Sequence, residues 1–272
     1  MTALLGEIIA FGMVGSAAGF IAGLLGIGGG LLVVPFLTLI LPFVGVPQNL
    51  LMHVAVATSL AIMIGTSASS IITHQLHGNI LWPLFKRVVF AGIFGALLGA
   101  SMADYLATGL LRVVFGMFTL FLSLVMFGVI DIKQQRDPPC LPDTWKLLLH
   151  TTGIASFCNL MGTGGGAILV PYFARHGIAM RNAVATAATC GFPMAVVGTI
   201  GLIVAGMKEQ GLPHGTIGYV YWPAVIAIVI PSILCAPLGA KVTTRLPTSQ
   251  LRKIFAIFLL IVSVDMIYSA LA

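Results

Sequence analysis

Two segments of this chain are nearly the same, although they lie in different halves. Residues 23–37 read GLLGIGGGLLVVPFL, and residues 159–173 read NLMGTGGGAILVPYF. Each segment has three consecutive glycines and a proline five residues after the last of them, Pro35 or Pro171. In a membrane-embedded chain, glycine-interrupted apolar segments at corresponding positions of two halves are the best sequence indicator of a transport site between repeats.

The composition is that of a membrane protein. Of the 272 residues, 59% are hydrophobic and 7% are charged, whereas soluble domains carry about 25% charged residues. Apolar runs of about 20 residues, long enough to cross a bilayer as helices, recur from end to end. No acidic residue occurs between Glu7 and Asp104. The composition therefore predicts a polytopic membrane protein that is embedded in the lipid bilayer.

The net charge of +6 would also suit a nucleic-acid-binding protein, but in a membrane protein basic residues mark the cytoplasmic loops. We therefore expect the bilayer, and no nucleic acid, as a partner. The four cysteines have a spacing that suits neither a metal site nor a disulfide framework. We expect no cofactor and no bound metal.

The similarity between the halves extends beyond the glycines. The matching segments are residues 55–58 and 183–186 (both AVAT), 78–83 and 218–223 (GNILWP and GYVYWP), 98–100 and 238–240 (both LGA), and 111–112 and 251–252 (both LR). A polar stretch with three prolines separates the two halves. The sequence therefore predicts a first repeat at 1–130, a cytoplasmic linker at 131–143 and a second repeat at 144–272.

Each half contains the same series of apolar runs. A run that leads into the glycines is followed by a shorter run and then by three long ones. Twelve residues of helix, the length of the first short run, cover only about 18 Å of a hydrocarbon core about 30 Å thick. We therefore expect an all-α polytopic membrane protein, in which each repeat is a glycine-tipped helical hairpin followed by three transmembrane helices. The sequence leaves open whether the hairpins are re-entrant or fully spanning. The expected runs lie at about 4–25, 31–42, 50–73, 81–103 and 109–130, and at 144–161, 167–174, 180–206, 219–240 and 248–271.

The distribution of basic residues favours one path through the membrane. If each glycine segment turns the chain back to the side it came from, only Arg112 and Lys208 fall on one side, and the other eleven of the 13 Lys and Arg residues fall on the opposite side. If each segment lies within a single crossing, the division is seven to six. Because cytoplasmic loops are rich in basic residues, we expect hairpins. Both termini then lie outside the cytoplasm, and each repeat has an odd number of crossings, so the repeats are inverted.

The glycine triplets each precede the start of a helix. A helix N-terminus binds anions through its unpaired N–H groups and its partial positive charge, and two inverted hairpins bring two such ends toward one site near the midplane. Irregular backbone at that depth is tolerated only beside protein or a water-filled cavity. We therefore expect a small anion to bind between the tips. The candidate residues are Gly28, Gly29, Gly30, Gly164, Gly165 and Gly166, with the polar side chains of Thr163, Asn159, Thr58, Ser59, Thr186 and Thr189.

Other interpretations of these features exist. Glycines in membrane helices often serve only close packing. This is the role expected for Gly12, Gly19, Gly95, Gly99 and Gly239. A dinucleotide-binding loop is disfavoured because no acidic residue stands about 20 positions after either triplet. An ion-coupled amino-acid or cation transporter and an anion channel stay open as alternatives, although membrane carboxylates are scarce. An intramembrane enzyme is not expected, because the sequence lacks paired membrane aspartates, a zinc-ligand cluster and a serine nucleophile motif.

The GGG motifs with their downstream prolines, the AVAT segments and the twofold repetition resemble the sulfite exporter TauE/SafE family of bacterial and archaeal membrane proteins, over nearly the whole chain. The resemblance implies export, by alternating access, of small sulfur-containing or organic anions such as sulfite, sulfoacetate, other sulfonates or thiosulfate. It carries over the two glycine triplets, Thr58 and Thr186 as site positions. It also implies a multi-pass protein of the cell (inner) membrane that is not an enzyme, and it is compatible with a homodimer.

Overall fold

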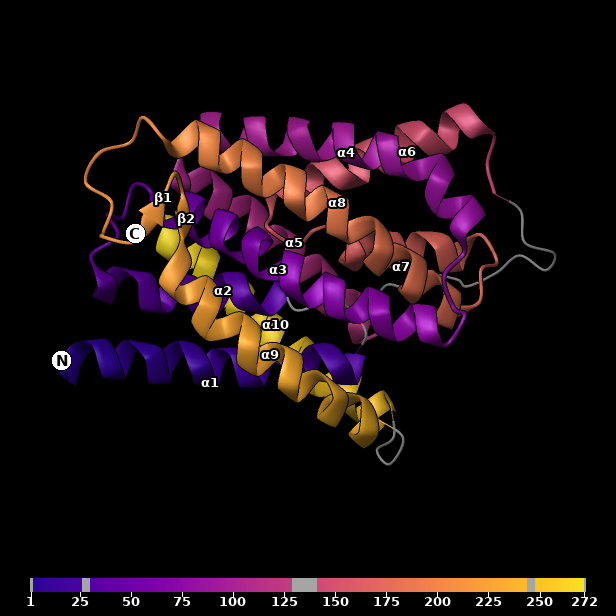
Figure 1. The fold of residues 1–272 in the computed structure, drawn as a ribbon, viewed down its shortest axis with the longest axis horizontal. Coiled ribbons are helices and arrows are strands. Elements are labelled where there is room, and N and C mark those ends of the chain that lie inside the picture. The colour runs from indigo at the N-terminus through magenta and orange to yellow at the C-terminus, as the bar shows by residue number, and fades with distance from the viewer. Residues whose placement is uncertain (1, 26–29, 129–140, 244–247, 272) are drawn as a thin grey trace.

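The structure is a computed structural model that describes residues 2–25, 30–128, 141–243 and 248–271 (Figure 1). The first half of the chain forms α1 (Thr2–Leu25), α2 (Gly30–Ile40), the 3₁₀ helix η1 (Leu41–Val44), α3 (Leu51–Leu76), α4 (Trp82–Tyr105) and α5 (Thr108–Met126). The second half forms α6 (Thr144–Leu160), α7 (Gly166–Arg175), α8 (Met180–Gly206), β1 (Thr216–Ile217), β2 (Val220–Tyr221), α9 (Trp222–Thr243) and α10 (Thr248–Leu271).

The prediction of an all-α polytopic membrane protein is confirmed. In the described part of the chain, five helices are long and apolar enough to cross a bilayer, namely α3, α4, α5, α8 and residues Lys253–Ala270 of α10. Shorter apolar helical segments lie in α1, in α2 with η1, and in α9. The two short runs after the glycines form α2 and α7, whose 11 and 10 residues extend only about 17 and 15 Å.

One expected helix begins later than its apolar run. The run at 219–240 opens with a strand, β2, which pairs antiparallel with β1, and α9 starts only at Trp222. Glycine permits this hairpin, because Gly215 and Gly218 have φ of +93° and +56°, in the region that side chains disfavour. The Trp222 N–H donates to the Gly215 carbonyl at 3.1 Å and closes the turn. Pro223 then occupies the first turn of α9, where proline's missing N–H costs nothing.

The helices alternate in direction along the long axis, and both termini lie at the same end of the molecule (Figure 1). After the glycines, α2 runs back toward the end where α1 begins, and α7 runs back toward the end where α6 begins. Corresponding helices of the two halves, such as α1 and α6, run in opposite directions. This arrangement is the one that inverted hairpin repeats require. The side of the membrane on which the termini lie stays a prediction.

The packing of the helices is paired between the halves. Helix α1 packs along α9 and α6 along α4, α3 packs on α9 and α8 on α4, and α2 lies against α3 as α7 does against α8. Two further pairs, α3 with α8 and α5 with α10, join counterpart helices directly. The counterparts of α1 to α5 in the second half are α6 to α10, in that order. If each helix is replaced by its counterpart, the α1–α9 contact becomes the α6–α4 contact, and the other contacts correspond in the same way. This is the pattern expected of two halves related by a twofold axis.

Helix α3 lies at the centre of this assembly, because every residue from Leu51 to Met63 is buried. A helix that is covered all round is a core helix. Helices α1 and α4 reach their partners through glycines: a Cβ at Gly19 would lie 2.2 Å from the Ser232 carbonyl oxygen, and one at Gly99 2.2 Å from that of Ser156. Gly95 packs in the same way, whereas Gly12 has nothing within 4 Å, so the packing role expected for Gly12 is wrong.

Candidate functional site

The second glycine segment forms a tight turn between α6 and α7. Gly162, Gly164 and Gly165 have φ of +70°, +60° and +96°, which only glycine adopts without strain. The Thr163 N–H donates to the Cys158 carbonyl at 2.8 Å and fixes the turn on the end of α6. Helix α7 starts directly after it, and the first N–H groups of a helix have no intrahelical acceptor. The turn therefore presents a helix N-terminus inside the protein.

The two glycine segments meet in the protein interior. Gly28 and Gly29 lie outside the described residues, but Gly30 is described as the first residue of α2. A Cβ at Gly30 would lie 2.9 Å from the Gly162 carbonyl oxygen and 3.2 Å from the Thr163 Cα. Gly30 is buried, and Thr163 is 2% exposed. We refer to Gly30 and residues 162–166 as the glycine tips.

The side chain of Met63, from α3, fills the space between the glycine tips. A Cβ at Gly30 would lie 2.5 Å from its Sδ, and a Cβ at Gly164 would lie 2.5 Å from its Cε. Met63 is buried. On the other side of the turn, a Cβ at Gly165 would lie 3.1 Å from the Sδ of Met194. Methionine is unbranched and has three rotatable bonds, so these side chains can clear the space by changing rotamer.

Ser59 joins the two tips to each other. Its hydroxyl lies 2.9 Å from the Gly162 carbonyl oxygen and 3.3 Å from that of Gly30. A serine hydroxyl has one hydrogen to donate, so these carbonyls share it. The predicted role of Ser59 as a donor to an anion therefore requires that it first release both tips.

Thr58 and Thr186 make equivalent bonds at opposite ends of the molecule. The Oγ1 of Thr58 accepts from the Tyr221 N–H at 3.1 Å, and the Oγ1 of Thr186 accepts from the Leu81 N–H at 3.1 Å. Tyr221 and Leu81 hold the same position, one residue before Trp-Pro, in the two halves. Each threonine thus binds the chain that enters a helix of the opposite half, α9 or α4. We refer to these two bonds as the threonine clasps.

The remaining predicted polar residues are buried and bonded locally. Thr163 donates to the Cys158 carbonyl at 3.2 Å, and Thr189 donates to the Ala185 carbonyl at 2.8 Å. Asn159 donates its Nδ2 to the Ala155 carbonyl at 2.9 Å, but its Oδ1 is buried without a partner. That oxygen is the one unsatisfied polar atom among the predicted site residues that the structure describes. A buried polar atom without a partner calls for a function or a bound molecule.

The structure also shows site residues that the sequence did not single out. Met63 and Met194 line the glycine turn, yet a methionine in an apolar helix has no distinctive sequence signal. The Cys158 thiol, fully buried, lies beside the Thr163 hydroxyl and the N–H groups of Gly165 and Ile168. The only feature of the sequence that pointed to Cys158 was its position a few residues before the second glycine triplet.

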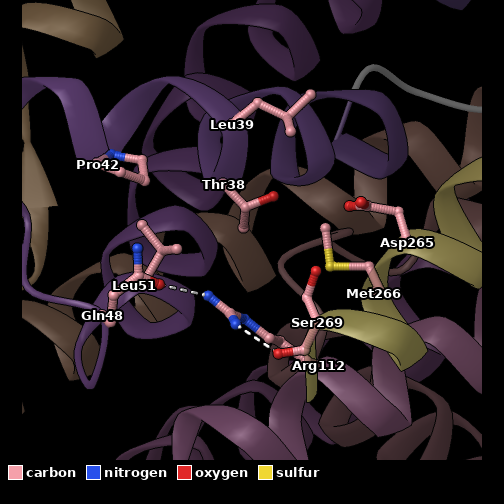
Figure 2. Close-up of a pocket in the computed structure, with 9 residues that line it drawn as sticks. All are labelled: Thr38, Leu39, Pro42, Gln48, Leu51, Arg112, Asp265, Met266 and Ser269. Atoms are coloured by element: carbon pink, nitrogen blue, oxygen red, sulfur yellow. Dashed lines mark hydrogen bonds between the residues drawn. The ribbon is translucent and has the colours of Figure 1, made fainter. Parts of the chain in front are cut away.

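A second polar site lies near the end of the molecule that carries the termini. It is a pocket of about 190 Å³ between α2, η1, α5 and α10, and Figure 2 shows its lining. Arg112 donates to the Ser269 carbonyl at 3.0 Å and to the Gln48 Oε1 at 2.9 Å. Asp265 lines the same pocket. Because this pocket holds both charges, it does not select an anion, and the glycine tips stay the stronger anion-site candidate.

Comparison with known proteins agrees with this architecture. A family profile described as sulfite exporter TauE/SafE matches residues 11–266. A probable membrane transporter protein of Haemophilus influenzae is 35% identical over 93% of this chain and 96% of its own length. A probable membrane transporter protein of Methanocaldococcus jannaschii is 29% identical over 88% of each chain, and one of Bacillus subtilis is 24% identical over 95% and 97%. No solved structure gives a significant match.

Proposed function

This chain belongs to the sulfite exporter TauE/SafE family of membrane transporters, and we propose that it exports small sulfur-containing anions such as sulfite, sulfonates or thiosulfate. The observation that carries the proposal is the meeting of the glycine tips. Gly30 touches the 162–166 turn, and α7 begins there, so that its first N–H groups point away from the rest of the helix toward the turn. These groups and the helix dipole stabilise an anion without any buried Lys or Arg.

We propose further that residues 1–130 and 144–272 are inverted repeats. The protein would lie in the inner membrane, with both termini on the side that faces away from the cytoplasm. The opposite directions of α1 and α6 and the paired helix contacts support the inversion. The basic residues support the orientation, because Lys86, Lys146 and Arg181 lie near the starts of α4, α6 and α8. All three helices begin at the end opposite the termini. Of the proposed linker, residues 131–140 lie outside the described residues.

The anion takes the place that Met63 fills. Binding then requires the thioether to swing away from Gly30 and Gly164, and requires Ser59 to exchange a carbonyl for the anion. Asn159, on α6, has a buried side-chain oxygen without a partner. A flip of the amide would present the nitrogen there instead and would break the bond from Nδ2 to the Ala155 carbonyl.

The proposal is tested by flux from proteoliposomes. Purified protein is reconstituted, the vesicles are loaded with radiolabelled sulfite, thiosulfate or sulfoacetate, and release is followed with and without an imposed potential. We expect saturable release that is faster with the inside negative, because such a potential contributes about 2.3 kcal/mol per charge per 100 mV. Vesicles loaded with alanine or with sodium test the rival substrates. Flux of either of these without anion flux would refute the proposal.

The Gly165→Val variant locates the site. Gly165 has φ of +96°, and a Cβ there would face Met194, so a β-branched side chain opposes the backbone conformation of the turn that presents the start of α7. Gly153→Val is the matched control, because Gly153 lies on α6 with nothing within 4 Å. We expect Gly165→Val to abolish anion release while Gly153→Val keeps it. Normal transport by Gly165→Val would place the anion elsewhere.

A further inference from the structure

His53, in the first turn of α3, is buried and has a polar partner at each ring nitrogen. Its Nε2 lies 3.0 Å from the Leu106 carbonyl oxygen, and its Nδ1 lies 3.3 Å from the Thr108 Oγ1. A carbonyl oxygen only accepts hydrogen bonds, so Nε2 must carry a hydrogen. The protonation of the ring then depends on what Thr108 offers to Nδ1.

Thr108 has a single hydroxyl hydrogen, and another acceptor takes it. The hydroxyl donates to the Asn49 carbonyl, in the connection before α3. Toward His53 the same oxygen is then only an acceptor. All three bonds exist together only if Nδ1 also carries a hydrogen, which makes the ring an imidazolium. With a neutral ring, Thr108 must leave Asn49 in order to donate to Nδ1.

The charged groups around His53 suit an imidazolium. Burial opposes the charge and is the larger effect, while the carboxylates of Asp104, on α4, and Glu209, in the connection after α8, act in favour of the charge. The Tyr219 ring lies 5.2 Å from the imidazole, and its hydroxyl donates to Asp104 at 3.0 Å. Burial raises the pKa of Tyr219, and the two carboxylates add to the effect, so its phenol stays neutral. Arg112, one turn along α5 from Thr108, points instead to Gln48 and Ser269.

The residue of the second half that corresponds to His53 carries a positive charge. Aligning the two AVAT segments puts Met52-His53 on Met180-Arg181. The second half thus has a permanently charged side chain where the first half has an imidazole, which can gain or lose a proton. Arg181 is exposed and His53 is buried, so only the charge of His53 is coupled to hydrogen bonds inside the protein.

We propose that His53 is a proton-binding site whose bound proton holds together the end of the molecule that carries both termini. With the proton bound, α3, the start of α5 and the connection at residue 49 share one chain of hydrogen bonds. When the proton leaves, either the Thr108–Asn49 bond or the Thr108–His53 bond is lost, and this junction loosens. We expect the rate of transport to change when His53 gains or loses its proton.

The proton site is tested first without transport, by nuclear magnetic resonance of the full protein with labelled histidine. His53→Gln identifies the His53 signals by their absence. We expect the wild-type ring to be an imidazolium at about pH 5 and to lose its proton as the pH rises toward about 8. Thr108→Val removes the acceptor for Nδ1–H and should move this titration to lower pH. A ring that stays neutral from pH 5 to 8, or an unmoved titration in Thr108→Val, would overturn the proposal.

Flux measurements then test the consequence. The substrate is sulfoacetate, both of whose acidic groups are ionised between pH 5 and 8, so its charge is constant. We expect wild-type flux to change across this range, and His53→Arg to give a nearly flat profile close to the wild-type rate at low pH. His214→Arg is the control, since His214 is exposed in a connection at the same end, and should keep the wild-type profile. An equal pH response in His53→Arg and wild type would also overturn the proposal. A complete lack of anion flux would refute the proposed function, whereas the resonance titration would still decide the proton site.

Discussion

The contact between Gly164 and Met63 allows a quantitative test of the glycine tips. In Gly164→Ala, the alanine must adopt the φ of +60° that Gly164 has. This left-handed backbone conformation costs an L-residue about 1–2 kcal/mol. The methyl carbon would also lie 2.5 Å from the Cε and 2.8 Å from the Sδ of Met63, well inside the optimal carbon contact of about 3.5–4.0 Å. Met63 must therefore leave its rotamer, at about 0.5–1.5 kcal/mol. Together these two costs give an expected destabilisation of about 1.5–3.5 kcal/mol.

Met63→Ala separates the two costs. Alone, it leaves a cavity and should destabilise the protein by about 2–5 kcal/mol. In the double variant the methyl group at 164 has room, so only the backbone cost of Gly164→Ala persists. The double variant should therefore be more stable than the sum of the single variants predicts, by about 0.5–1.5 kcal/mol. In flux assays, Met63→Ala should raise anion release, because it empties the space between the tips.

Unfolding of the purified variants in mixed detergent micelles, followed by tryptophan fluorescence, measures these differences. Gly153→Ala is the matched control, since it adds a methyl group to α6 in open space and should stabilise the helix by up to about 1 kcal/mol. Strict additivity in the double variant would show that residues 63 and 164 do not share one space. A Gly164→Ala variant as stable as Gly153→Ala would refute the steric reasoning altogether.

Two further predictions concern the scaffold. Thr58→Val and Thr186→Val each leave an N–H of the opposite half without its acceptor, that of the buried Tyr221 or of the half-buried Leu81. Each should destabilise the protein, by about 1–3 kcal/mol in the same unfolding assay; a neutral effect of either would contradict the clasps. Gly19→Ala puts a methyl group 2.2 Å from the Ser232 carbonyl oxygen and should destabilise the α1–α9 contact by about 1–3 kcal/mol or more. Gly12→Ala, which meets nothing, is its control, and equal melting temperatures would refute the close packing.

Much of the fold could be predicted from the sequence, because the features that determine it are local and repeated. Apolar runs mark the membrane helices, and the short runs after the glycines form α2 and α7. The β1–β2 hairpin could not be predicted in this way. Residues 216–221 are apolar enough to extend the next helix, and the turn depends on the left-handed conformations of Gly215 and Gly218.

The candidate site was only partly predictable, for a different reason. Glycine triplets are rare enough to be noticed, but the partners of a hydroxyl cannot be inferred from local sequence. Thr58 finds its donor at Tyr221, and Ser59 finds an acceptor at Gly162, each more than 100 residues away. Such contacts exist only once two halves have assembled, and a single sequence holds no record of them.

The bonds between the halves limit how the transporter can move. The threonine clasps lie toward opposite ends, because α3 and α8 begin at opposite ends, and both clasps are formed here at 3.1 Å. Alternating access, as we propose it, opens one end while the other stays closed, so each opening breaks one clasp and keeps the other. Because the clasps are equivalent, they favour neither direction. The bond chain through His53 strengthens only the end that carries the termini, and the corresponding Arg181 is exposed. As we propose it, the protonation of His53 therefore makes the two openings unequal in energy.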